Sequence, residues 1–98
     1  MVKHIVMWKL REFDTEQERE EAKQKFKQML EALNGVIEGM PHLEVGFGFG
    51  KGAYDVALYS EFESKEALEQ YHINPVHSKV DEYIKSITVE RVFADYLV

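Results

Sequence analysis

Apolar residues follow two different spacings in the first third of the chain, and each spacing predicts a different element. Residues 2–10 are rich in β-branched and aromatic side chains, and the apolar run 5–8 predicts a strand that is buried on both faces. Thr15 and Glu18 have the spacing of a helix capping box. Apolar positions then recur at helical spacing between residues 22 and 33. The pattern therefore predicts a strand followed by an amphipathic helix.

Glycine residues divide the middle of the chain. All six glycines lie between Gly35 and Gly52, and the first of them mark the end of the predicted helix. Residues 42–49 and 54–62 have the composition of strands, and the glycine-rich segment between them predicts a hairpin. The second and third strands are therefore expected to be antiparallel neighbours.

The last third of the chain predicts a helical region that is split in two. Ser64 is a suitable N-cap for a helix over residues 65–71, and Asn74-Pro75 interrupts that helix. A further helix is expected over residues 76–85. Residues 88–98 then predict a closing strand with apolar side chains on both faces.

The resulting order of elements is βαββαβ, with no linker, so residues 1–98 are expected to form a single domain. Two strand–helix–strand units with right-handed crossovers give an α+β, ferredoxin-like sandwich with an antiparallel sheet in the order 4-1-3-2. Helices in this fold cover only one face of the sheet. Because the first, third and fourth strands carry apolar side chains on both faces, including either Trp8 or Met7, and Tyr59, the other face needs a cover. The simplest cover is a second copy of the sheet, which predicts a homodimer through sheet-on-sheet packing, a dimeric α+β barrel.

Composition and charge exclude several classes of function. The formal net charge of −6 argues against nucleic acid and anionic membrane surfaces as partners. The chain has no cysteine, so disulfides, thiol nucleophiles and cysteine metal sites are excluded. No apolar run has the length of a membrane span, which is about 18 residues or more, and a soluble, cytoplasmic protein is expected.

Two motifs resemble ligand-binding patterns but have the wrong context. Residues 48–53 fit a loose G-x-G-x-x-A pattern, yet strand residues follow instead of a helix N-terminus, which favours a hairpin over a dinucleotide site. His72 and His77 are five positions apart, without helical i,i+4 spacing and without a carboxylate between them. We therefore expect no metal and no other cofactor.

Three residues are candidates for acid–base chemistry. His4 shares a strand face with apolar neighbours and so needs a polar partner, either a hydroxyl or a backbone carbonyl, or a role in a site. Tyr71 and His77 flank the Asn74-Pro75 break, where a loop can direct two side chains into one cavity. A neutral imidazole can remove a proton next to a carbonyl group, and a phenol can donate to the enolate oxygen that develops.

The whole chain resembles the stress-responsive dimeric α/β-barrel (Dabb) family. The resemblance is carried by the opening residues 1–10, by residues 54–58 of the third strand, by the Tyr-x-x-x-Pro-x-His segment 71–77 and by residues 93–96. It implies a ferredoxin-like fold and a dimer built by packing two sheets, in agreement with the burial argument.

The family includes a plant polyketide cyclase that closes a poly-β-keto chain by aldol condensation. The resemblance implies that His77 is the base, that Tyr71 is its partner and that His4 is the strand histidine of the site. It also implies substrate-binding pocket positions at Val6, Trp8, Phe26, Leu30 and Leu58. A small hydrophobic carbonyl or aromatic compound would be the ligand.

Three functions follow as hypotheses. The first is a stress-response-type dimer with a small-molecule pocket that performs acid–base chemistry on a carbonyl substrate, with His77 and Tyr71 as the reacting groups. The second is a non-enzymatic, structural dimer in which the pocket is a packed core. The third is a haem-binding or haem-degrading barrel, because related barrels use a helix histidine as the iron ligand. An open cavity beside His77 would favour the first hypothesis, and a filled core would favour the second.

Overall fold

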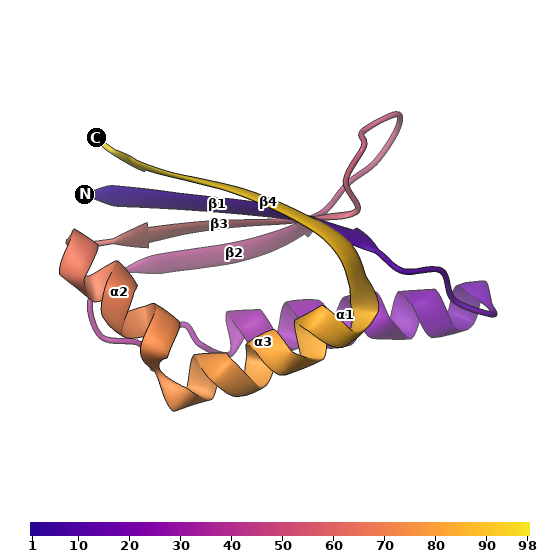
Figure 1. Ribbon diagram of the computed structural model, residues 1–98, viewed down its shortest axis with the longest axis horizontal. Helices are drawn as coiled ribbons and strands as arrows, with labels where there is room; N and C mark the ends of the chain where they lie inside the picture. Colours follow the sequence, from indigo (N-terminus) through magenta and orange to yellow (C-terminus); the bar gives the residue numbers. More distant parts are fainter.

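The computed structural model describes residues 1–98. Its elements are β1 (Val2–Leu10), α1 (Glu16–Glu31), β2 (His42–Phe47), β3 (Val56–Phe62), α2 (Lys65–Ile73), α3 (Pro75–Ile87) and β4 (Thr88–Leu97). The strands form one antiparallel sheet in the order β2-β3-β1-β4, and all helices lie on one side of it (Figure 1). Read from the other edge, this order is 4-1-3-2, so the predicted ferredoxin-like fold is confirmed.

Each of the three helices begins directly after a short polar residue that caps it. The side chain of Thr15 accepts a hydrogen bond from the amide of Glu18, 3.1 Å away. Ser64 caps α2 in the same way. Asn74 caps α3, and Pro75 is the first residue of that helix, where its missing N–H has no partner to lose. Short polar side chains therefore set the start of each helix.

The hairpin between β2 and β3 is longer than predicted. β2 ends at Phe47 instead of residue 49, and β3 begins at Val56 instead of residue 54. Asp55 explains the second difference, because its carboxylate accepts hydrogen bonds from the Leu10 amide (2.8 Å) and from Arg19 (2.9 Å). These contacts tie the end of the loop to β1 and α1, so regular pairing with β2 starts only afterwards. No helix of the chain is both long enough and apolar enough to cross a membrane.

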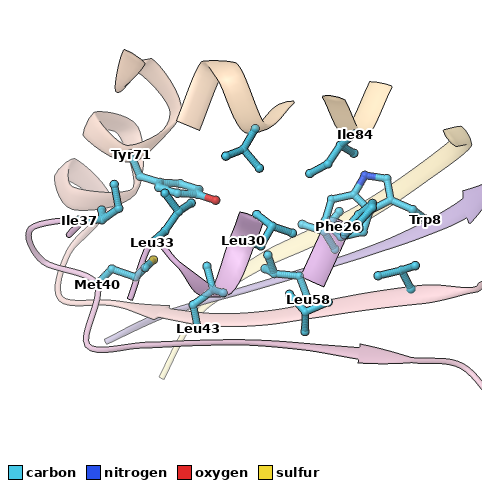
Figure 2. Close-up of a cluster of buried hydrophobic side chains, with 14 of the residues drawn as sticks. Trp8, Phe26, Leu30, Leu33, Ile37, Met40, Leu43, Leu58, Tyr71 and Ile84 are labelled. Atoms are coloured by element: carbon cyan, nitrogen blue, oxygen red, sulfur yellow. The ribbon is translucent and has the colours of Figure 1, made fainter. Parts of the chain in front are cut away.

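The core fills the space between the sheet and the helices. Every second residue of β1, from Val2 to Leu10, is buried and points toward the helices. Trp8 packs edge-on against Phe26 of α1, with ring centroids 4.9 Å apart (Figure 2). Leu30 and Leu58 are almost completely buried beside them. This continuous cluster holds α1 flat against the sheet.

The opposite face of the sheet carries no helix (Figure 1). In the pairing of β1 with its neighbours, Ile5 lies beside Tyr59 and Met7 lies beside Val92 on this face. Met7 is 37% exposed. Glu61 limits the apolar area at one end, where it pairs with Lys3 and accepts a 2.6 Å hydrogen bond from the Tyr59 hydroxyl. In the single chain, an apolar strip bordered by charges therefore faces solvent.

Candidate functional site

An open cleft of about 580 Å³ lies between α3 and β4. It forms because β4 leaves the end of α3 and continues at the edge of the sheet, where the helices no longer cover it (Figure 1). The lining combines apolar, aromatic and charged side chains: Trp8, His72, His77, Asp81, Ile84, Lys85, Thr88, Val89, Glu90, Arg91 and Phe93. A cleft of this size and composition can hold a small organic molecule.

The break between α2 and α3 brings three rings together at one end of the cleft. Tyr71 and His72 are in the last turn of α2, and His77 is in the first turn of α3. The ring centroids of Tyr71 and His77 are 4.1 Å apart, and those of His72 and His77 are 5.8 Å apart. The two rings are neighbours, but only His77 lines the cleft, whereas the sequence led us to expect both side chains in one cavity. We refer to His72 and His77 together as the cleft histidines.

The His77 imidazole is held in its neutral form. Its pKa is lowered from the ordinary value, chiefly because burial disfavours the charged ring, while Asp81 acts in the opposite direction. The backbone of His72 also favours the charged ring. Nδ1 of His77 is the one buried side-chain polar atom without a hydrogen-bond partner, whereas Nε2 is not enclosed in this way. The ring is therefore a neutral base that no internal hydrogen bond occupies.

Tyr71 contacts His77 through its ring and not through its hydroxyl group. The side chain is 2% exposed, and its hydroxyl group points into the apolar cluster near Leu33 (Figure 2). Burial raises the pKa of the phenol above its ordinary value, with a further increase from Asp81 and an opposing effect of Arg91. Tyr71 therefore stays protonated and acts on the imidazole mainly as a packing surface.

His4 reaches the same group of rings from the sheet. It is 3% exposed, and its Nδ1 contacts a carboxylate oxygen of Asp95, the residue directly opposite in β4. Its ring lies edge-on to His72 with centroids 5.4 Å apart. The partner of His4 is thus a carboxylate, and neither of the partners expected from the sequence, a hydroxyl or a backbone carbonyl, is used by the ring.

His72 and Asp95 were not assigned to the site by the sequence analysis. Besides the cleft, His72 lines a second cavity of about 450 Å³ that also includes Asp95, Val2 and Leu68. The pKa of His72 is lowered by partial burial and then by the nearby His4 and His77. The register of β1 with β4 was the missing signal, because it places Asp95 opposite His4.

The pocket positions implied by the family resemblance divide into two groups. Trp8 lines the cleft. Val6, Phe26, Leu30 and Leu58 are at most 2% exposed, belong to the core and line neither of the two cavities. The open space beside His77 therefore lies under β4 and not inside the core. No group of three or more histidine or carboxylate side chains is arranged to hold a metal ion.

Comparison with known proteins identifies both a family and several structural relatives. Residues 2–98 match the model of the Stress responsive A/B Barrel Domain, Dabb. The structure of a dimeric protein of unknown function from Bacteroides fragilis superposes with a TM-score of 0.89 at 32% identity, covering 99% of this chain and 95% of that chain. No curated protein sequence matches the chain significantly.

Two further structures share the fold at lower identity. A dimeric ferredoxin-like protein of unknown function from Thermobifida fusca has a TM-score of 0.84 at 18% identity, covering 99% of this chain and 90% of that chain. Hydroxynitrile lyase from Passiflora edulis has a TM-score of 0.77 at 16% identity, covering 99% of this chain and 92% of that chain. At these identities the likeness concerns the fold alone.

Proposed function

The chain belongs to the stress-responsive A/B barrel (Dabb) family, and on this premise we propose that it binds a small carbonyl compound in the cleft and uses His77 as a general base. The observation that carries the proposal is the state of His77. Its imidazole lines an open cleft, has a lowered pKa and has no hydrogen-bond partner of its own. A neutral imidazole at the edge of a ligand-sized space is suited to proton transfer.

The proposed step is the removal of a proton from the carbon next to the carbonyl group. We assign the ring proton to Nδ1, close to the His72 carbonyl, which leaves the accessible Nε2 as the base. Nε2 takes the proton, the C–H electron pair moves toward the carbonyl carbon, and the enolate oxygen takes up the negative charge. Tyr71 serves as a positioning residue, because its ring packs against the imidazole and restricts its orientation.

The proposal is tested with a stable ketone that needs no knowledge of the natural substrate. 3-Benzoylpropanoate in D₂O exchanges the protons next to its ketone group, and proton NMR measures the rate. The protein is expected to accelerate this exchange, and His77→Gln is expected to lower the accelerated rate by about 100-fold or more. Lys51→Ala changes an exposed residue of the hairpin between β2 and β3, which lines neither cavity, and should keep the full rate. An unchanged rate in His77→Gln, or no acceleration by the unmodified protein, would refute the proposal.

We also propose that the protein acts as a homodimer through its open sheet face. The apolar strip around Ile5, Met7 and Tyr59 is the surface that a second sheet would cover. Support comes from the Bacteroides fragilis relative at 32% identity, which is described as dimeric. The cleft lies on the opposite side of the sheet, so each chain of the dimer would keep its own cleft open.

A non-enzymatic role as a structural dimer is the second candidate function, and the packing of the core favours it. Val6, Phe26, Leu30 and Leu58 leave no ligand space at the pocket positions implied by the family resemblance. If the exchange assay and a broader set of β-keto thioesters and phenolic acids all show no binding, this second role becomes the better account.

A further inference from the structure

One positive charge in the cleft has no counter-charge. Asp81 and Lys85 form an ion pair of 2.9 Å on α3, so their charges compensate each other. Glu90 is opposite Lys9 in the strand register, and its carboxylate already accepts a hydrogen bond of 3.1 Å from the Tyr54 hydroxyl. Arg91 is the remaining charged residue of the lining.

Arg91 differs from the other two arginines of the chain. Arg19 forms an ion pair with Asp55, and Arg11 donates a hydrogen bond to the carbonyl of Glu12. The guanidinium group of Arg91 makes neither an ion pair nor a hydrogen bond, and it lies 4.7 Å from the ring centroid of Phe93. An aromatic face holds a guanidinium in place without using any of its N–H donors. All five donors therefore remain free at the cleft.

Arg91 lies on the same side of the sheet as Trp8 and the cleft histidines. It is directly opposite Trp8 in the pairing of β1 and β4, and so it faces the helices together with the indole that lines the cleft. Its charge contributes to lowering the pKa of both cleft histidines and of Tyr71. A ligand bound to Arg91 would thus lie in the same electrostatic environment as His77.

We propose that Arg91 is the anion-binding residue of the cleft, and that the ligand carries a carboxylate group in addition to the carbonyl group on which His77 acts. The planar fork of a guanidinium matches a carboxylate through two parallel hydrogen bonds, which a lysine cannot reproduce. This inference rests on the proposed function and names its substrate class, the oxo acids. In a chain with a net charge of −6, Arg91 also attracts an anion to a place that the rest of the surface would repel.

The test compares two ligands of nearly equal shape. 3-Benzoylpropanoate carries the carboxylate, and 3-benzoylpropanamide replaces it with a neutral amide. Titration calorimetry at low salt should show that the unmodified protein binds the carboxylate about tenfold more tightly than the amide, as expected for a charge-assisted, solvent-accessible contact. Arg91→Gln should bind both ligands equally, with its affinity for the amide unchanged. Arg91→Lys should retain part of the preference, and Lys51→Ala should retain all of it.

The possible outcomes separate this inference from the proposed function. Equal binding of both ligands by the unmodified protein, or a full preference in Arg91→Gln, would refute the role of Arg91 and leave His77 as the base. If the preference for the carboxylate is lost in Arg91→Gln but the proton exchange does not depend on His77, the role of His77 as the base is refuted and the anion site is supported. Failure of both ligands to bind would refute both proposals. A loss of the dimer in Arg91→Gln would show that the guanidinium contacts a partner chain, which also refutes the anion site.

Discussion

We expect His77→Ala to leave the free energy of unfolding unchanged or to raise it by up to about 3 kcal/mol, because the gains of this substitution offset its loss. Loss of the ring contact with Tyr71, at a centroid distance of 4.1 Å, costs about 0.5–1.5 kcal/mol. Removal of a buried nitrogen without a hydrogen-bond partner returns about 1–3 kcal/mol. Alanine also favours the helix by about 0.5 kcal/mol. Together these effects amount to between zero and about 3 kcal/mol in favour of the folded state.

Urea denaturation at pH 7.5 measures this change. Trp8 is the single tryptophan of the chain, so its fluorescence and the far-ultraviolet circular dichroism report on the sheet and the helices separately. The protein concentration must be the same for all variants, because the stability of a dimer depends on it. An unchanged denaturant slope would show that the unfolded states are comparable.

His4→Ala is the contrasting variant. His4 is 3% exposed and its loss leaves Asp95 without its partner, so we expect a decrease of about 2–3 kcal/mol. If His77→Ala also costs more than about 2 kcal/mol, the imidazole supports the fold in a way that the contacts do not show. The hypothesis that His77 serves as a base and does not stabilise the fold would then be refuted.

Three further predictions concern the assembly, the pH dependence and the connection after α1. Light scattering should give twice the chain mass of 11.5 kDa, and Tyr59→Lys should dissociate or unfold the protein; a folded monomer of the unmodified chain would refute sheet-on-sheet packing. The pKa values of both cleft histidines are lowered from 6.5, so below pH 6.5 the unfolded chain takes up protons that the folded chain does not. The free energy of unfolding should therefore decrease as the pH is lowered in this range, by at most about 1.4 kcal/mol per pH unit for each ring. Alanine at both positions should flatten this pH dependence in urea melts. Gly39→Ala should be more destabilising than Gly35→Ala in thermal melts, because both have positive φ but only at Gly39 would the new Cβ lie 2.8 Å from Ala67; equal losses would contradict this reasoning.

Local signals in the sequence were sufficient for most of the fold. Thr15 and Ser64 precede segments with apolar positions at helical spacing, and their side chains do cap the helices. The strand ends next to the hairpin could not be predicted, because they depend on Asp55, whose partners Leu10 and Arg19 are distant in the sequence.

The candidate site was only partly accessible from the sequence. Tyr71 and His77 are six positions apart across a helix break, so their proximity follows from local geometry. The contact of His4 with Asp95 depends on strand register over a separation of 91 residues, and the free charge of Arg91 depends on which other side chains are already paired. Such properties arise only from the completed tertiary structure.

The place of β1 in the sheet has a consequence for how the chain folds. β1 lies between β3 and β4, and the amide of Val98 donates a 3.0 Å hydrogen bond to the carbonyl of Met1, so the two ends of the chain lie together (Figure 1). The first of the four strands in chain order is therefore a central one, and one of its two neighbours is the last of the four. The contacts of β1 with β4 have high sequence separation, which slows folding, and the sheet is complete only once β4 has been synthesised. Until then the apolar side chains of β1 remain open to chaperones, and the cleft, whose one wall is β4, is the last part of the molecule to form.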